Sequence, residues 1–394
     1  MIPMKPEMFK LRTIFNKNGF DIRICGGFVR DWILHKYEIE PHDIDLCTDA
    51  TPDEQRQIYE KNDIRHIDTG LKHGTWTIVM DQTYEITSLR TDTDCDGRHA
   101  KVKYTRDWIL DLGRRDLTFN SMLMDLDGEI LDPFNGISDL LNGIVRFVGE
   151  PNERIREDYL RILRWFRFHA RIGKGVFHTE DTVTCLAIVQ NMHGLQKISR
   201  ERVWSEFKRI ISDPNGLVEI AQMLAYGIAS FIDLPTPETN MVSFYRLQIA
   251  HKYTKNSISL MAAYLGSRDN VILLANAWKW SNDERDLAFS IVFFIENNVI
   301  SPLDEAKRRI VLGISDKHAM IETMHVLGLL KEAIEIKNWN APVFPIRGAD
   351  LLNLNMKTGP NIGEKLSLLK AYWIKSNYAF TKNDLINILI TEHQ

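Results

Sequence analysis

Near its start the chain contains a strand, a glycine turn and a helix in immediate succession. Residues 22–25 are mostly apolar and β-branched, which predicts a strand. Gly26 and Gly27 interrupt it, and helical spacing follows over residues 28–36, with Arg30 in the first turn. Glycine lets the backbone approach an anion closely, and the first N–H groups of a helix are free to bind phosphate. Such a glycine pair is often only a turn, but here it predicts a phosphate site.

A second strand follows over residues 42–46 and carries two acids. Strand alternation places Asp43 and Asp45 on one face of this strand, and Ile44 on the other. Magnesium prefers oxygen ligands and usually shares them with substrate phosphates. An Asp-x-Asp at a strand edge is more often solvated than ligating. Beside a phosphate-binding turn, however, Asp43 and Asp45 predict a magnesium site for nucleotidyl transfer.

The next hundred residues mix strands and helices. Thr51 precedes a predicted helix over residues 53–61 as its N-cap. Three strands are then predicted over residues 64–68, 75–80 and 83–89. Glu85 lies in the middle of the last one, where it is either a third carboxylate of the metal site or an exposed strand residue. These elements predict an α+β head with a small antiparallel or mixed sheet and helices on one side.

The remainder of the head contains a loop, a charged helix and a hairpin. Residues 90–107 are polar and aperiodic, which predicts a long mobile loop. A helix is expected to carry residues 114–120, whose adjacent arginines form either a surface cluster or a clamp for a triphosphate. A hairpin over residues 122–131 turns at Asp127 and Gly128, and a short helical turn follows over residues 138–142.

From residue 151 onward helical patterns replace strand patterns, and one helix is predicted over residues 155–169. Asp158, Arg161, Arg164 and Arg167 recur there at every third position, which would form a slanting row on the helix surface. One interpretation is a salt-bridged face of an amphipathic helix. The other is that Asp158 and Arg161 bind a nucleobase edge, because Asp accepts from the exocyclic amine that C and A share.

Composition limits what else the chain can be. Its 394 residues suffice for two or more domains, and its net charge of −4 restricts RNA binding to local basic surfaces. The four dispersed cysteines predict reduced thiols. No apolar run reaches membrane-spanning length, and no protein partner is indicated. The segment before the first predicted strand is short for a targeting presequence, so we expect a cytoplasmic protein.

Five motifs stand in an order typical of one enzyme family: residues 26–31, 43–45, 114–120, 132–136 and 157–164. In them the chain resembles the class II CCA-adding enzymes, which are tRNA nucleotidyltransferases of the DNA polymerase β superfamily. Residues 345–351 and 359–363 resemble the tail motifs of that family. The resemblance implies a seahorse-shaped fold with a catalytic head over residues 1–145, followed by an all-α neck (146–212), body (213–320) and tail (321–394).

The resemblance also implies an activity and its residues. The activity is addition of C, C and A to the 3′ end of tRNA from CTP and ATP, without a nucleic-acid template, by two-metal transfer that releases pyrophosphate. Asp43 and Asp45 would bind Mg²⁺, and Glu85 matches the third catalytic carboxylate. The positions expected to bind the nucleotide are Gly26, Gly27, Arg30, Arg115, Asp158, Arg161, Arg164 and Arg167.

Further positions are expected to serve the final A or the RNA. Arg90, Asp92 and Arg98 lie in a segment that resembles the flexible loop used for A addition, which enzymes adding only CC lack. Candidate RNA contacts are Arg202, Lys208 and Arg209 in the predicted neck and Arg347, Lys357, Lys365 and Lys370 in the predicted tail. Single lysines on helices are usually only solvated.

Three alternatives remain open from the sequence. A bacterial-type poly(A) polymerase shares the head and neck motifs, but the loop and the tail motifs argue against it. An inactive RNA-binding scaffold would not require the carboxylates Asp43, Asp45 and Glu85. A metal-dependent glycosyltransferase would use Asp-x-Asp but would explain neither the paired arginines nor the arginine row.

Overall fold

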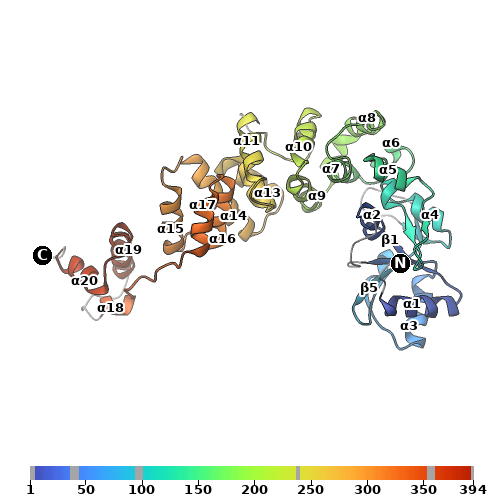
Figure 1. Ribbon diagram of the computed structural model, residues 1–394, viewed down its shortest axis with the longest axis horizontal. Helices are drawn as coiled ribbons and strands as arrows, with labels where there is room; N and C mark the ends of the chain where they lie inside the picture. The colour runs from blue at the N-terminus through green and yellow to red at the C-terminus, as the bar shows by residue number, and fades with distance from the viewer. Residues whose placement is uncertain (1–4, 36–43, 94–100, 237–239, 353–359, 392–394) are drawn as a thin grey trace. The chain divides into compact units, whose positions relative to one another are not determined.

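The computed structural model describes residues 5–35, 44–93, 101–236, 240–352 and 360–391. The chain divides into two compact units, Met1–Leu234 and Pro235–Gln394. The strands all belong to the first unit, and the described part of the second is helical (Figure 1). The expected α+β head with an α-helical remainder is therefore confirmed, whereas the division into four domains stays a prediction.

A seven-stranded sheet organises the first unit, with the strand order β3-β4-β5-β2-β1-β8-β9. Neighbouring strands are antiparallel except for β2 and β5, which run parallel, so the sheet is mixed. The strands are β1 (Ile22–Cys25), β2 (Asp45–Thr48), β3 (Arg65–Gly70), β4 (Thr75–Val79), β5 (Thr83–Ser88), β8 (Leu123–Met124) and β9 (Ile130–Leu131). The predicted strands and the hairpin are confirmed to within a few residues.

The register of β2 brings two acids side by side. Asp45 pairs with Glu85 across the parallel β2–β5 ladder and with Cys25 across the antiparallel β1–β2 ladder. Asp45 and Glu85 are both exposed, while Leu46 and Ile86 beside them are buried in the core. The alternation expected for this strand is thus observed over residues 44–46, and Asp43 lies outside the described residues.

Helices of the first unit begin where local chemistry supports them. Thr51 caps α3 (Pro52–Lys61) by accepting from the Glu54 N–H, and the Glu54 side chain completes a capping box. Gly136 begins α5 (Gly136–Asn142), where an added Cβ would stand 2.4 Å from the Thr118 carbonyl oxygen. The other helices before residue 150 are α1 (Pro6–Lys17), α2 (Gly27–Leu34) and α4 (Trp108–Gly113).

The long loop expected over residues 90–107 is wrong at both of its ends. Strands β6 (Arg90–Thr93) and β7 (Lys101–Tyr104) form a two-stranded antiparallel ribbon. Strand β6 contains no apolar residue, and the alternation of Val102 and Tyr104 in β7 spans only four residues, so the periodicity did not reveal the ribbon. Asp92 belongs to β6, and Arg98 lies outside the described residues.

The single helix expected over residues 114–120 is also wrong. Helix α4 ends at Gly113, and a short 3-10 turn, η2, covers Thr118–Asn120. The Thr118 N–H donates to the Arg146 carbonyl, and the Asp116 carbonyl accepts from the Val148 N–H. These backbone groups pair with a distant segment, so they cannot also pair along a helix.

The helix expected over residues 155–169 is broken at Asp158. Helix α6 (Pro151–Glu157) ends there, and α7 (Arg161–Arg171) begins three residues later. Asp158 is extended, with φ −153° and ψ 106°, and its Oδ1 accepts from the Leu160 N–H at 3.1 Å. A short Asp side chain that bonds nearby backbone competes with the helix in this way.

Three further α-helices of the first unit are α8 (Asp181–Asn191), α9 (Arg200–Ser212) and α10 (Gly216–Ala225). In the second unit, one apolar cluster gathers around Phe294, Met320 and Ile336, and another gathers around Leu369 and Trp373. The helices of this unit run from α11 (Asn240–Ala250) to α20 (Lys382–Thr391). None of the helices in the described residues is long and apolar enough to cross a membrane.

Candidate active site

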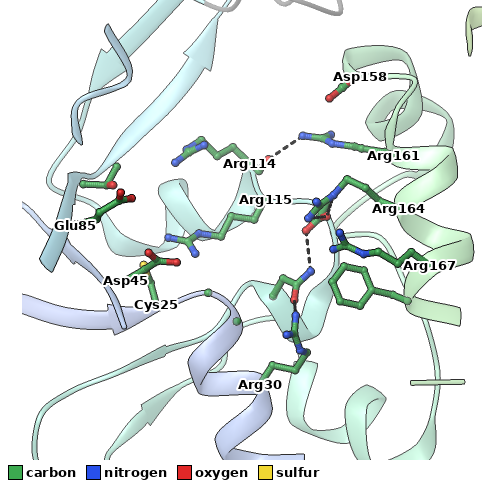
Figure 2. Close-up of a pocket in the computed structure, with 16 residues that line it drawn as sticks. Cys25, Arg30, Asp45, Glu85, Arg114, Arg115, Asp158, Arg161, Arg164 and Arg167 are labelled. Atoms are coloured by element: carbon green, nitrogen blue, oxygen red, sulfur yellow. Dashed lines mark hydrogen bonds and ion pairs between the residues drawn. The ribbon is translucent and has the colours of Figure 1, made fainter. Parts of the chain in front are cut away.

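One open cavity of about 610 Å³ in the first unit collects most of the predicted site residues. Figure 2 shows carboxylates on one side of it, arginines of α7 on the other, and Arg115 between them. The lining side chains and turns come from β1, α2, β2, β5, the segment after α4, and α7. The predicted residues that line it are Gly26, Gly27, Arg30, Asp45, Glu85, Arg115, Asp158, Arg161, Arg164 and Arg167.

The acidic side of the cavity is formed by Asp45 and Glu85, which are neighbours on parallel strands. Both side chains are exposed and present oxygen atoms, the donor type that magnesium prefers. In the part of the chain that the structure describes, no group of three or more His, Cys, Asp or Glu side chains could hold a metal. Because magnesium usually takes only one or two carboxylates together with substrate phosphates, this pair fits such an ion.

The glycine turn lies directly beside Asp45. Gly26 has φ +74°, a backbone conformation that favours glycine, and a Cβ there would stand 3.6 Å from Asp45 Oδ2. At Gly27, where α2 begins, a Cβ would stand 3.4 Å from the Arg30 guanidinium. The turn therefore brings its backbone close to Asp45 and Arg30, while its role in binding phosphate stays a prediction.

Arg30 is buried and fixed by hydrogen bonds on two sides. Its Nε and Nη2 donate to the two oxygens of Asp31, and its Nη1 donates to Asn120 Oδ1, each at 2.9 Å. Asn120 in turn donates to Asp116 at 3.2 Å, and Asp116 accepts from Arg164 Nε at 2.6 Å. A continuous polar chain therefore connects the α2 turn to α7.

Asp116 and Asn120, the two middle members of that chain, also line the cavity, although neither had been predicted to have a separate role. Asp116 is almost fully buried. Burial favours a raised pKa for Asp116, but the charge of Arg164 and hydrogen bonds to the carboxylate outweigh it and lower the pKa. The motif at residues 114–120 was the signal for these two residues.

Arg114 and Arg115 share one buried partner, Asp111 of α4. Arg114 Nη2 lies 2.8 Å from Asp111 Oδ1, and Arg115 Nη2 lies 3.0 Å from Asp111 Oδ2. Burial favours a raised pKa for Asp111, but the charges of Arg115 and Arg114 lower it. Asp111 was not among the predicted residues, although its spacing of three and four residues from the arginines is typical of helical ion pairs.

Each arginine of the row on α7 has an acidic partner. Arg161 Nη1 lies 2.6 Å from Glu157, and Arg167 Nη1 lies 2.9 Å from Glu206 of α9. Burial lowers the pKa of Arg167 to about 10, although Glu206 opposes the shift. Arg167 also stacks over Phe168, 4.2 Å from the ring centroid. The row is therefore three arginines on one helix, with Asp158 on the segment before it.

Asp158 lies at the upper end of this row (Figure 2), and its carboxylate has two fixed partners. Oδ1 accepts from the Leu160 N–H, and Oδ2 accepts from Arg202 Nη2 at 2.7 Å. Arg202 had been predicted to bind RNA, and the structure places it against the predicted base-reading residue instead of leaving it as an isolated surface charge. The acids and the arginine row thus share one cavity, as the interpretation of the sequence required.

Other predicted residues lie elsewhere. Arg90, at the start of β6, donates from its side chain to the His73 carbonyl. On α9, Lys208 covers the Trp204 ring, with Nζ 5.2 Å from its centroid, and Arg209 is exposed. In the second unit, Lys365 and Lys370 are half-buried on α19 (Pro360–Lys375), and Lys357 lies outside the described residues. The RNA-binding roles of these residues remain predictions.

Comparisons with known families identify two regions. Residues 22–146 match the family model described as "Poly A polymerase head domain". Residues 181–239 match the one described as "Probable RNA and SrmB- binding site of polymerase A". The first region contains the glycine turn, Asp45, Glu85 and the paired arginines.

Named relatives match the chain over nearly its whole length. The chain is 37% identical over 391 residues to CCA tRNA nucleotidyltransferase 1, mitochondrial, of Danio rerio, and the match covers 96% of this chain and 89% of that protein. It is 32% identical over 387 residues to the CCA-adding enzyme of Lactobacillus johnsonii, with 93% of each covered. Since the vertebrate relative is a mitochondrial protein, a cytoplasmic location for this chain remains an untested prediction.

Solved structures have the same fold. The CCA-adding enzyme of Bacillus stearothermophilus in complex with CTP matches with a TM-score of 0.78 and 25% identity, over 99% of both chains. The CCA-adding enzyme of Thermotoga maritima complexed with tRNA matches with a TM-score of 0.67 over 98% of this chain, at 18% identity. The second likeness shows the fold alone.

Proposed function

This chain belongs to the CCA-adding enzymes, the tRNA nucleotidyltransferases, and from that premise we propose how its cavity works. It adds C, C and A to the 3′ end of tRNA, using CTP and ATP and no nucleic-acid template. The observation that supports this proposal best is the single cavity in which two carboxylates face a row of arginines. One side of such a cavity suits a reacting phosphate, and the other suits the base and its charged substituents.

The reaction is a nucleotidyl transfer. The 3′-hydroxyl of the tRNA gives up its proton to water as its oxygen bonds to the α-phosphorus of the nucleotide. The bond from that phosphorus to the bridging oxygen of the β-phosphate breaks, and pyrophosphate leaves with that oxygen. Asp45 and Glu85, with Asp43, would hold Mg²⁺, which when bound supplies Lewis-acid stabilisation of the attacking and leaving oxygens. Arg30 and Arg115 provide fixed positive charge for the triphosphate, which suits the forked donors of arginine.

Base choice belongs to the other side of the cavity. The carboxylate of Asp158 accepts from the exocyclic amine of C or A, and Arg161 donates to a ring nitrogen or carbonyl oxygen. U and G present a carbonyl oxygen where C and A present that amine. Arg164 and Arg167 lie beside this pair, on the following turns of α7.

The test uses a tRNA that lacks its last three nucleotides, offered CTP alone, ATP alone or both, with the products sequenced at their 3′ ends. We expect Asp45→Asn and Glu85→Gln each to lose C and A addition by about 10²-fold or more while tRNA binding stays unchanged, because each removes a charge needed at the reacting phosphate. Asp127→Asn, at the exposed hairpin turn, is the matched control. Full activity of Asp45→Asn would contradict the proposed site.

The same experiment decides between this function and poly(A) synthesis. The head matches a model named after poly(A) polymerases, so a run of A residues is the natural alternative product. The full-length similarity to CCA-adding enzymes favours products that stop at CCA. Extension beyond CCA with ATP would favour the polymerase.

A further inference from the structure

We propose that Arg202 of α9 is a positioning residue that fixes the carboxylate of Asp158 and thereby sets the discrimination of C and A from U and G. The inference rests on the proposed function, because it assumes that Asp158 meets the base. It assigns to Arg202 a role different from the phosphate contact that its position in the sequence suggested. It also explains why the row on α7 is packed against α9.

The first observation is the geometry at Asp158. The residue lies in the break between α6 and α7, where its backbone is extended. Both carboxylate oxygens have a partner, since Oδ1 accepts from the Leu160 N–H at 3.1 Å and Oδ2 accepts from Arg202 Nη2 at 2.7 Å. The Leu160 contact is local, whereas the Arg202 contact comes from another helix. Arg202 is therefore the group that holds the carboxylate from the side of α9.

The second observation is the charge pattern of α9. Arg202 and Glu206 are four residues apart, which places them on one face of the helix. Glu206 is buried, with Oε1 3.6 Å from Arg164 and Oε2 2.9 Å from Arg167. Helix α9 thus places the cation Arg202 beside Asp158, the one acid of the row. It places the anion Glu206 beside Arg164 and Arg167. This complementarity fixes which residue of α9 faces Asp158.

The consequence for base choice follows from hydrogen-bond chemistry. An ionised carboxylate only accepts hydrogen bonds, so it matches the amine of C or A and opposes the carbonyl oxygen of U or G. A carboxylate held at both oxygens cannot turn away from a mismatched carbonyl. Without Arg202 the Asp158 carboxylate is free to rotate. It then binds the amine of C or A less firmly and repels the carbonyl oxygen of U or G less strongly.

The experiment measures kcat/KM for CTP and for UTP in the full-length enzyme, with the tRNA that lacks its last three nucleotides. The variants are Arg202→Met and Arg202→Gln, with Arg202→Lys as the conservative replacement and Asp158→Asn as the reference. Arg200→Met is the matched control, because Arg200 lies on the same helix and pairs with Asp233 outside the cavity. KM for tRNA and the thermal midpoint are measured in parallel.

We expect Arg202→Met and Arg202→Gln to lower the CTP:UTP ratio by about tenfold or more, the scale of one directional base contact. The lower ratio should come mainly from a higher KM for CTP and a higher kcat/KM for UTP, with KM for tRNA unchanged. Arg202→Lys should recover part of the ratio, because an ammonium group still donates to Asp158. In the background of Asp158→Asn, a second change at Arg202 should have little further effect, since both act on one contact.

The outcomes separate the inference from the proposed function. The inference would be overturned if Arg202→Met left the CTP:UTP ratio unchanged but raised KM for tRNA, with a rise that becomes smaller at higher salt. Arg202 would then be assigned to RNA phosphates. If Arg202→Met does not fold, the ratio in Arg202→Gln decides in the same way. A ratio that changes in Asp158→Asn but not in the Arg202 variants leaves base reading intact and refutes only the positioning role. No change in any of them refutes base reading by Asp158 itself.

Discussion

At the scale of single residues, the cavity is built from acids that each hold two arginines. The three cases are Asp111 with Arg114 and Arg115, Glu157 with Arg154 and Arg161, and Glu206 with Arg164 and Arg167. An arginine that is already fixed loses less conformational freedom when a triphosphate binds. The acids therefore preorganise positive charge while preventing the full mutual repulsion of the guanidinium groups.

Asp111→Asn tests this arrangement. We expect KM for both CTP and ATP to rise by about tenfold, the value of one charge-assisted hydrogen bond, because Arg114 and Arg115 lose their common anchor. We also expect lower stability at pH 7, since removing one partner of a buried ion pair costs about 3 kcal/mol or more. Steady-state kinetics and urea unfolding measure the two effects, with Asp53→Asn, at the exposed start of α3, as the control.

The pH dependence of that stability difference has a definite sign. The pKa of Asp111 is lowered in the folded protein, so its contribution is present above the unfolded value of about 4 and disappears as the pH falls through the folded pKa. The gap between wild type and Asp111→Asn should therefore be full at pH 7 and narrow below about pH 4. A gap that is constant from pH 7 to pH 3 would argue against the ion pairs.

The residues that line the cavity were largely predictable, whereas the residues that support them were not. Arg30, Asp45 and the arginines of α7 lie in motifs whose spacing already suggests chemistry. Glu206 supports two of those arginines from a helix about forty residues away, so no local pattern connects it to them. Such pairs depend on how helices pack, and a single sequence does not contain that information in a readable form.

At the scale of elements, local hydrogen bonding decided where helical periodicity failed. The apolar and charged spacing over residues 155–169 suits one helix, yet Asp158 bonds the backbone two residues on and breaks it. The same break gives Asp158 its place at the end of the row. In the segment at residues 114–120, pairing with residues 146–148 replaced a helix in a similar way. Periodicity describes which face is apolar, but it does not show whether side chains compete for the backbone.

Helix α7 also has a buried ionic contact away from the cavity, at His169. Its Nδ1 lies 2.7 Å from Glu219 of α10, and its Nε2 lies 3.6 Å from Asp181 of α8. All three side chains are almost completely buried. Burial opposes the charged imidazolium, but the nearby carboxylates of Asp181 and Glu219 outweigh it and raise the pKa of His169 to about 9.

This contact predicts a loss of stability at alkaline pH. A folded-state pKa above the unfolded value of about 6.5 means that the contribution of His169 is complete below pH 6.5 and is lost as the pH rises through 9. Its size is on the order of 3 kcal/mol. Urea unfolding from pH 6.5 to 9.5 should show a falling free energy of unfolding for wild type.

Substitutions identify the source of that slope. Glu219→Gln keeps an oxygen that can accept from His169 but removes the charge, so the slope between pH 7 and 9 should become shallower. His35→Gln, at the exposed end of α2, should leave it unchanged. If wild type and Glu219→Gln have the same slope, the alkaline titration belongs to other groups.

At the scale of the whole molecule, the cavity and much of the expected RNA contact belong to different parts of the chain. Among the described residues, those that line the cavity all precede residue 169. Arg202 and Glu206, which support the row from α9, also precede the boundary at Leu234. The second unit has its own apolar clusters. The net charge of −4 means that tRNA must be attracted by local basic regions of the chain rather than by its overall charge.

A chain truncated after Leu234 therefore provides the last prediction. We expect it to unfold cooperatively, because it keeps the whole first unit. We also expect it to bind CTP within about twofold of the full-length Kd, because it keeps the cavity and the supporting residues Arg202 and Glu206. Its affinity for tRNA should be much weaker, and the dependence of that affinity on salt should be shallower, since each lost phosphate contact reduces the slope of log K against log salt by about one. Calorimetry with CTP and filter binding of tRNA at several salt concentrations measure these quantities in both chains. Equal tRNA affinity and equal slopes would show that the first unit alone holds the RNA, and the residues expected in the tail, such as Lys365, would then be ordinary solvated charges.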